Sequence, residues 1–244
     1  MRYLIVAEYD GTEFSGFQSQ TNGRAVQDVL QKAASELYKT DIKITGCSRT
    51  DAGVHARGHV SHMDVPFEIP EEKIPLALNA LLPEDVAVKK AQRVGDDFSA
   101  RFNNNGKRYI YRIFSSRTPS PLMGRYSHFC TYDLNLENMQ KAARHFEGRH
   151  NFEAFCAAGG SQNTFERLIY KVNVTQKGQL FEIEVAGQAF LYNMVRIIAG
   201  TLMEVGTGKI APDDIPKIIE SRDRKMAGPT LPAKGLTLEE VYLL

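Results

Sequence analysis

The segment that most constrains the fold is residues 48–56, which set one carboxylate among small residues between two alternating runs. Residues 42–47 and 60–65 alternate apolar and polar side chains, which is typical of half-buried strands. Asp51 is therefore expected on a loop carried by a sheet, where its small neighbours leave the carboxylate open to a large, flat substrate. An isolated aspartate in a turn more often only hydrogen-bonds its own backbone. Other segments must decide between these two roles.

Hydrophobic periodicity predicts the other elements and divides them into two halves. In the first half we expect a strand at 2–9, a helix at 25–38, the strands beside the Asp51 loop, a helix at 71–82 and a strand at 86–94. In the second half we expect a strand at 107–115, a helix at 135–147, strands at 168–176 and 180–186, helices at 190–205 and 212–221, and a strand at 236–243. A turn signal at residues 103–106 predicts domains at 1–104 and 105–244. Because both halves have a broadly similar order of elements, we expect α+β halves whose sheets join, with a cleft between them.

Composition indicates a cytoplasmic globular protein. Of the 244 residues, 43% are hydrophobic and 24% are charged, and no run is long and apolar enough to span a membrane. Glu8 interrupts the apolar N-terminal run before the core of a signal peptide is complete. Cys47, Cys130 and Cys156 are odd in number and far apart, so they predict reduced thiols rather than a disulfide framework.

Positive charge is concentrated in residues 98–132, although the net charge of the chain is only +1. This segment has no Asp or Glu, and it interleaves six Arg or Lys residues with eight aromatic residues, a pattern that suits nucleic acid. The alternative is a solvated basic face over core aromatics. On a strand, alternation sets Tyr109 and Tyr111 on the face opposite Arg108 and Arg112, so several of the rings are expected in the core.

Arg196 is the one charged residue between Glu184 and Glu204, within a predicted helix that is apolar on almost every side. Such a helix is usually buried, and a buried arginine keeps its charge and needs a partner. Leaving it unpaired costs about 3 to 5 kcal/mol. Asp51 is the partner we would choose, and the pairing would hold that carboxylate ionised. Pairing with Glu204, or reaching the surface, fits the spacing equally well.

Taken together, five groups of segments resemble the tRNA pseudouridine synthase A family. They are residues 9–12 with 16–20, residues 49–56, residues 98–101 with 107–112, residues 150–152 with Phe155, and residues 190–197 with 232–236. The resemblance extends through nearly the whole chain in the family's order. Phe17 stands where a Trp is usual, Ser48 where Gly is usual, and Leu231 where a small residue is common. None of these departures removes a group that the chemistry needs.

The resemblance implies a fold, an activity and partners. The fold would be the pseudouridine synthase fold, with two similar α/β halves and mainly antiparallel sheets joined around a central cleft. The enzyme would isomerise uridine to pseudouridine in the anticodon stem-loop of tRNA, at tRNA positions 38–40, without a metal or other cofactor. It would act as a homodimer, with tRNA lying across both subunits.

The resemblance also assigns site residues. Asp51 is similar to the family's catalytic aspartate, Tyr109 to the tyrosine that stacks under the target base, and Arg196 to the arginine paired with the aspartate. Arg49 resembles the residue that helps to displace the target nucleotide from the stem. By the same matching, the residues that bind substrate are Arg49, Tyr109, Phe17, Gln18, Arg108 and Leu191.

Two other functions are weighed against this one. A metal-dependent hydrolase would use Asp51 with His55, His59 and His62, which are metal-ligand types. If residues 59–65 form a strand, however, His59 and His62 point to opposite faces and cannot share one ion. An RNA-binding module without catalysis would use the basic segment alone and would leave Asp51 and Arg196 unexplained.

Overall fold

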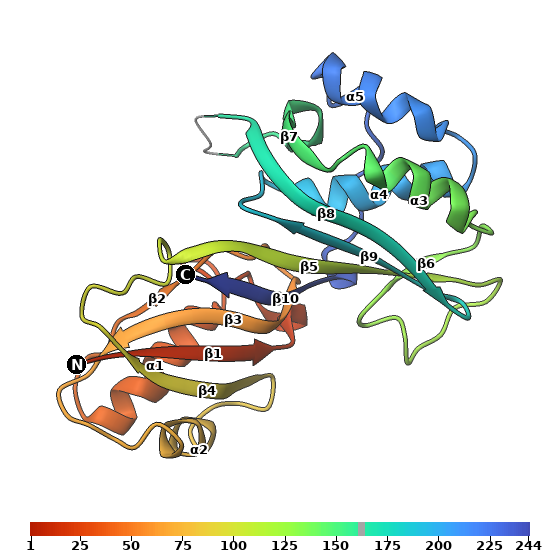
Figure 1. The fold of residues 1–244 in the computed structure, drawn as a ribbon. Coiled ribbons are helices and arrows are strands. Elements are labelled where there is room, and N and C mark those ends of the chain that lie inside the picture. Colours follow the sequence, from red (N-terminus) through yellow and green to blue (C-terminus); the bar gives the residue numbers. More distant parts are fainter. Residues whose placement is uncertain (161–163) are drawn as a thin grey trace. The chain divides into compact units, whose positions relative to one another are not determined.

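The computed structural model describes residues 1–160 and 164–244. The chain forms two compact units, Met1–Asn105 with Thr237–Leu244, and Gly106–Leu236. Each unit carries its own set of strands with helices packed on them (Figure 1). Among the helices of these described ranges, none is long and apolar enough to cross a membrane.

The first unit is built on a sheet with β1 at its centre. Its elements are β1 (Arg2–Tyr9), the short 3-10 helix η1 (Gly11–Glu13), α1 (Val26–Tyr38), β2 (Ile44–Gly46), β3 (His55–Asp64), α2 (Lys73–Asn79), β4 (Val86–Val94) and β10 (Leu236–Leu243). β3 and β4 pair with β1 on either side, both antiparallel. β2 pairs antiparallel with β3, and β10 pairs parallel with it. The helices α1 and α2 contact each other and cover the sheet (Figure 1).

Burial explains the order of this sheet. β1 is flanked by strands on both edges, and its side chains from Tyr3 to Ile5 are almost completely buried. α1 presents an apolar face that includes Val26 and Leu30, and it ends where Lys39 takes a left-handed conformation with φ 56°. The predicted strand 2–9 and helix 25–38 are therefore confirmed almost to the residue.

The second unit has a sheet with the order β5-β9-β8-β7. Its elements are β5 (Asn104–Ser115), β6 (His128–Cys130), α3 (Leu136–Arg144), β7 (Gly148–Asn151), η2 (Glu153–Phe155), β8 (Glu166–Lys177), β9 (Leu180–Gly187), α4 (Met194–Gly206), η3 (Pro212–Asp214), α5 (Ile215–Ser221) and η4 (Ala233–Gly235). The four main strands pair antiparallel, and β6 adds in parallel to β5. The three helices α3, α4 and α5 gather on one side of these strands (Figure 1).

α4 is the buried helix of this unit, as its apolar sequence predicts. Its buried residues include Ile197, Ile198 and Leu202, each completely enclosed. The helix begins at Met194, four residues later than predicted, because Asn193 has a left-handed backbone with φ 60°. The α+β fold class and the mainly antiparallel pairing are confirmed.

The C-terminal strand belongs to the first unit, which differs from the predicted domain 105–244. β10 lies beside the start of β3, with Thr237 opposite His55 and Leu238 opposite Ala56. Periodicity predicts that residues 236–243 form a strand, but it does not say which strand they pair with. The partner is decided by tertiary packing, and here it is an element almost two hundred positions earlier in the chain.

Candidate active site

Backbone hydrogen bonds hold the loop that carries Asp51. The Phe17 N–H donates to the Thr50 carbonyl at 3.2 Å, and the Gly53 N–H donates to the Phe14 carbonyl at 3.2 Å. These bonds join residues 14–17 to both sides of Asp51, which is half-buried. Two of the segments that carry the family resemblance therefore form one structural unit, in which the position of the carboxylate is fixed by its neighbours.

The loop closes on itself in a turn and is anchored below. The Val54 N–H donates to the Asp51 backbone carbonyl at 3.1 Å, and Gly53 supplies the left-handed conformation with φ 78°. On the buried side, the hydroxyls of Tyr9 and Thr50 hydrogen-bond at 2.8 Å. The turn is therefore closed through the backbone carbonyl of Asp51, on a loop whose base is anchored in the core.

Gly16 allows the close approach between these two segments. Its φ is 106°, and a Cβ placed there would lie 2.5 Å from the Thr50 carbonyl oxygen. We expect Gly16→Ala to move the loop. The rate of the reaction in which Asp51 acts should then fall between tenfold and hundredfold, because misplacing a catalytic group by about 1 Å lowers the rate up to about 10²-fold. A single-turnover assay measures this. Gly178→Ala is the matched control, since Gly178 has φ 60° and nothing within 4 Å of its Cβ position. Equal effects of the two variants would contradict the expected contact.

The three histidines of β3 contact different parts of the unit. His59 is completely buried, its Nε2 donates to the Ser48 carbonyl at 3.0 Å, and its ring stacks on Phe17 at 3.8 Å. His55 Nδ1 accepts the N–H of Gly11 at 3.0 Å. Within residues 1–160 and 164–244, no three His, Cys, Asp or Glu residues gather as a metal ion would need. The histidines instead tie β3 to the loops around Asp51.

His62 fixes the turn that follows β4. Its Nδ1 accepts the N–H of Ala100 at 3.2 Å, which requires that nitrogen to be unprotonated. Burial, and then the charge of Arg2, lower the pKa of His62 below the ordinary 6.5. The neutral ring thus stabilises the fold fully above pH 6.5, and this contribution is lost as the pH falls through the lowered pKa.

The expected loss of stability at low pH can be tested by chemical unfolding. Between pH 7.5 and pH 5, we expect the free energy of unfolding of the wild type to fall more steeply than that of His62→Gln, because the variant lacks the titrating ring. Urea unfolding at several pH values measures both slopes. Parallel slopes would show that His62 does not couple protonation to folding.

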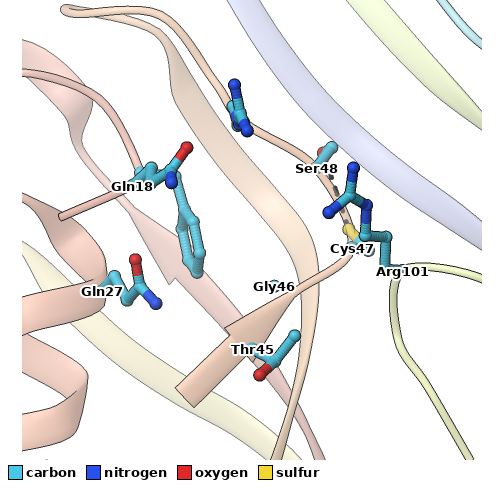
Figure 2. Close-up of a pocket in the computed structure, with 9 residues that line it drawn as sticks. Gln18, Gln27, Thr45, Gly46, Cys47, Ser48 and Arg101 are labelled. Atoms are coloured by element: carbon cyan, nitrogen blue, oxygen red, sulfur yellow. Dashed lines mark hydrogen bonds between the residues drawn. The ribbon is translucent and has the colours of Figure 1, made fainter. Parts of the chain in front are cut away.

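A pocket of about 270 Å³ opens beside the Asp51 loop (Figure 2). It is lined by Phe17, Gln18, Gln27, residues 45–49 and Arg101. Figure 2 shows Gln18 and Gln27 on one side, and Ser48 and Arg101 on the other. Three of the residues predicted to bind substrate, Phe17, Gln18 and Arg49, therefore lie together. Phe17 is only 2% exposed, so it supports the pocket from within the core.

Arg101 and Gln27 are pocket residues that the sequence did not identify. Arg101 lies in one of the segments that carry the resemblance, but nothing in the sequence indicates that it lines the same pocket as Arg49. Gln27 accepts the N–H of Ser19 at 2.9 Å and donates to the Ile44 carbonyl at 2.7 Å. An amide residue on the first turn of a helix carries no sequence signal for this role.

In the second unit, β5 separates its rings from its charges as predicted. Tyr109 and Tyr111 are buried, and Arg108 and Arg112 are half-buried on the alternate positions. The Tyr109 ring packs edge-on against Phe190, with centroids 5.2 Å apart. Tyr111 belongs to the core: its hydroxyl donates to the Pro232 carbonyl at 2.8 Å, and burial raises its pKa.

Two arginines of the basic segment, Arg112 and Arg101, differ in whether a carboxylate neutralises their charge. Arg112 Nε donates to Glu182 at 2.8 Å, across the register pair of β5 and β9. This ion pair shields much of the charge of Arg112 from a nucleic acid. Arg101, in contrast, is exposed, and its guanidinium carbon lies 5.5 Å from the Phe102 ring centroid.

Arg196 lies in the first turn of α4 and is held by the loop before η4. Its Nε donates to the Leu231 carbonyl at 2.6 Å, and its Nη1 donates to the Asn193 side chain at 2.7 Å. The Leu231 N–H returns a hydrogen bond to the Arg196 carbonyl at 3.4 Å. Because Leu231 acts through its backbone, its departure from the family's small residue leaves this contact intact. Leu191, just before α4, is 5% exposed.

A carboxylate on a braced loop, beside a pocket whose charges are arginine, fits an α+β enzyme that acts on an anionic ligand. The sequence profile of the family described as tRNA pseudouridine synthase matches residues 5–103 and 142–242, and the chain belongs to this family of isomerases. The predicted resemblance is confirmed.

Relatives are similar to this chain along nearly its full length. The tRNA pseudouridine synthase A of Acetivibrio thermocellus is 47% identical over 98% of each chain, and that of Bacillus subtilis is 44% identical over 99% of each chain. Among solved structures, the archaeal box H/ACA sRNP Nop10-Cbf5 complex aligns with 93% of this chain and 60% of its own, with 12% identity and a TM-score of 0.40.

Proposed function

We propose that this protein isomerises uridine to pseudouridine in the anticodon stem-loop of tRNA, at tRNA positions 38–40, with Asp51 as the catalytic carboxylate. The proposal is supported by family membership and by the names of relatives that match the chain from end to end. The single observation that carries the assignment of Asp51 is its loop, which is held on both sides by residues 14–17 and anchored by Tyr9.

The reaction rearranges bonds without net oxidation or reduction. The bond between C1′ and N1 breaks, the uracil rotates in the pocket, C5 bonds to C1′, and the proton on C5 leaves. One carboxylate is enough, because the departing uracil is a stabilised anion that returns as the nucleophile. A glycoside hydrolase needs two, since its leaving group must be protonated. Asp51 has three routes open to it: attack on C1′, addition to C6 of the base, or removal of a proton from C2′.

Other residues take the roles that the resemblance assigns. Tyr109 stacks on the base and helps to remove the C5 proton, and Arg196 holds Asp51 in its ionised form. A uridine in a stem must be flipped out of the helix, at a cost of a few kcal/mol. Arg49 offsets part of this cost by filling the gap that the base leaves.

Binding of the tRNA and assembly of the enzyme complete the proposal. The basic segment, with Arg108 and Arg101, contacts phosphates of the anticodon arm, and Leu191 contacts the base. The active enzyme is a homodimer with tRNA lying across both subunits, and it works in the cytoplasm without a cofactor.

The experiment that tests this function uses an unmodified tRNA transcript and the purified protein, in EDTA and without any added cofactor. We expect pseudouridine in the anticodon arm, located by base-specific mapping. Cleavage of the RNA that appears only after a metal ion is restored would favour the metal-dependent hydrolase instead. Tight binding with no conversion would leave an RNA-binding protein whose Asp51 is structural.

A further inference from the structure

The pocket beside the Asp51 loop lies next to the reaction centre without including it. Its lining ends at Arg49, two residues before Asp51, and two residues span at most about 7 Å of chain. A ligand there would lie about one nucleotide away from a uridine whose C1′ faces Asp51. A volume of about 270 Å³ is small for a ligand site, so the pocket can enclose only a small part of an RNA.

The charge of the pocket favours an anion. Among the described residues, the charged ones that line it are Arg49 and Arg101, and both are exposed. An arginine that lines a pocket can bind a phosphate well, because its guanidinium offers several donors in a planar fork. The flat face of a guanidinium also stacks on bases.

The backbone that carries Arg101 is held in place before any ligand arrives. The N–H of Ala100 donates to His62 at 3.2 Å, and the Asn104 side chain donates to the carbonyls of Ala100 and Arg101, each at 3.0 Å. The turn that presents the guanidinium is thus bonded on both sides. Such preorganisation lowers the entropy cost of binding.

The wall opposite Arg101 is polar. Gln18 and Thr45 are exposed and line the pocket, and Gln27 is fixed at both ends of its amide. A Cβ on Gly46 would collide with the Phe17 ring, so the glycine leaves room for that ring. Amide and hydroxyl groups on such a wall match the edge of a base, whereas an apolar wall would not.

Building on the proposed function, we propose that this pocket binds the nucleotide that flanks the target uridine. Its phosphate lies against Arg101, and its base faces Gln18 and Thr45. The pocket then holds the RNA backbone next to whichever uridine reaches Asp51.

The test is binding of an anticodon stem-loop RNA in which one phosphate is made neutral as a methylphosphonate. The 5′ and 3′ phosphates of the target are replaced in turn. We expect one of the two to weaken binding to the wild type about five- to tenfold, as the loss of a charged hydrogen-bonded contact does. Arg101→Ala should weaken binding of normal RNA similarly and lower the salt slope by about 0.7 to 0.9. With the neutral RNA, Arg101→Ala should then have no further effect.

The matched control is Arg93→Ala, since Arg93 is exposed, lies 3.4 Å from Glu68 and does not line the pocket. It should leave the salt slope unchanged. If the neutral phosphates weaken the wild type and Arg101→Ala by equal factors, Arg101 does not bind a flanking phosphate and the proposal is overturned. Binding requires no chemistry, so this result is independent of whether the wild type forms pseudouridine, which is scored in parallel on the same RNA.

Discussion

Replacing Asp51 with Asn is expected to reduce pseudouridine formation at least about 10³-fold, because the amide cannot act as a nucleophile or base. The side chain keeps its size, so the braced loop and the adjacent pocket should keep their shape. The affinity for tRNA should stay within a few-fold of the wild type. Single-turnover conversion with saturating protein separates the chemical step from binding.

Asp41→Asn is the matched control for this variant. Asp41 is exposed between α1 and β2, outside the Asp51 loop, and its replacement removes the same charge from the same unit. We expect it to convert tRNA at the wild-type rate. An Asp51→Asn protein that retained its activity would mean that another group performs the chemistry.

Arg196→Gln is expected to have the second largest effect, lowering the conversion rate about 10²- to 10³-fold, similar to the loss of one preorganised electrostatic partner. The physical reason is the proposed role of the arginine, which favours the ionised form of Asp51. Without it, the acid limb of the pH–rate profile should move to higher pH. Rates measured from pH 5 to pH 9 give the shift.

A purely structural role for Arg196 is distinguished by two further variants. Arg196→Lys keeps the charge but cannot reproduce both observed bonds, to Leu231 and to Asn193, so it should recover the acid limb while losing some stability. Arg144→Gln removes a charge from the exposed face of α3 and should change neither quantity. If Arg196→Gln lowers stability without moving the acid limb, the arginine serves only to hold the loop before η4.

Local periodicity predicted the elements that bury one clear face. β1, α1 and β4 have nearly the predicted bounds, since each combines a regular apolar pattern with strong end signals. The four-residue strand β7 and the three-residue strand β6 were missed, because they are too short to show any period. The position of β10 in the first unit could not be predicted either, because local periodicity does not indicate which distant strand a strand pairs with.

The sequence predicts those parts of the candidate site in which the residue types of one short segment indicate the chemistry. The Asp51 loop stood out because a lone carboxylate among small residues between strands is unusual. The contacts that brace it, from Phe14, Gly16 and Phe17, are made largely by backbone atoms, and these have no residue-type signal. Arg101 lines the same pocket as Arg49 because of the turn that His62 holds, so only the three-dimensional structure reveals this placement.

The most direct test of the central claim is tritium release from tRNA labelled at C5 of uridine, because isomerisation expels that hydrogen. With the wild type we expect release to proceed in step with pseudouridine formation in the anticodon arm, and with Asp51→Asn we expect none above background. Release by Asp51→Asn at the wild-type rate would contradict the assignment of Asp51, and no release by the wild type would contradict the proposed reaction itself.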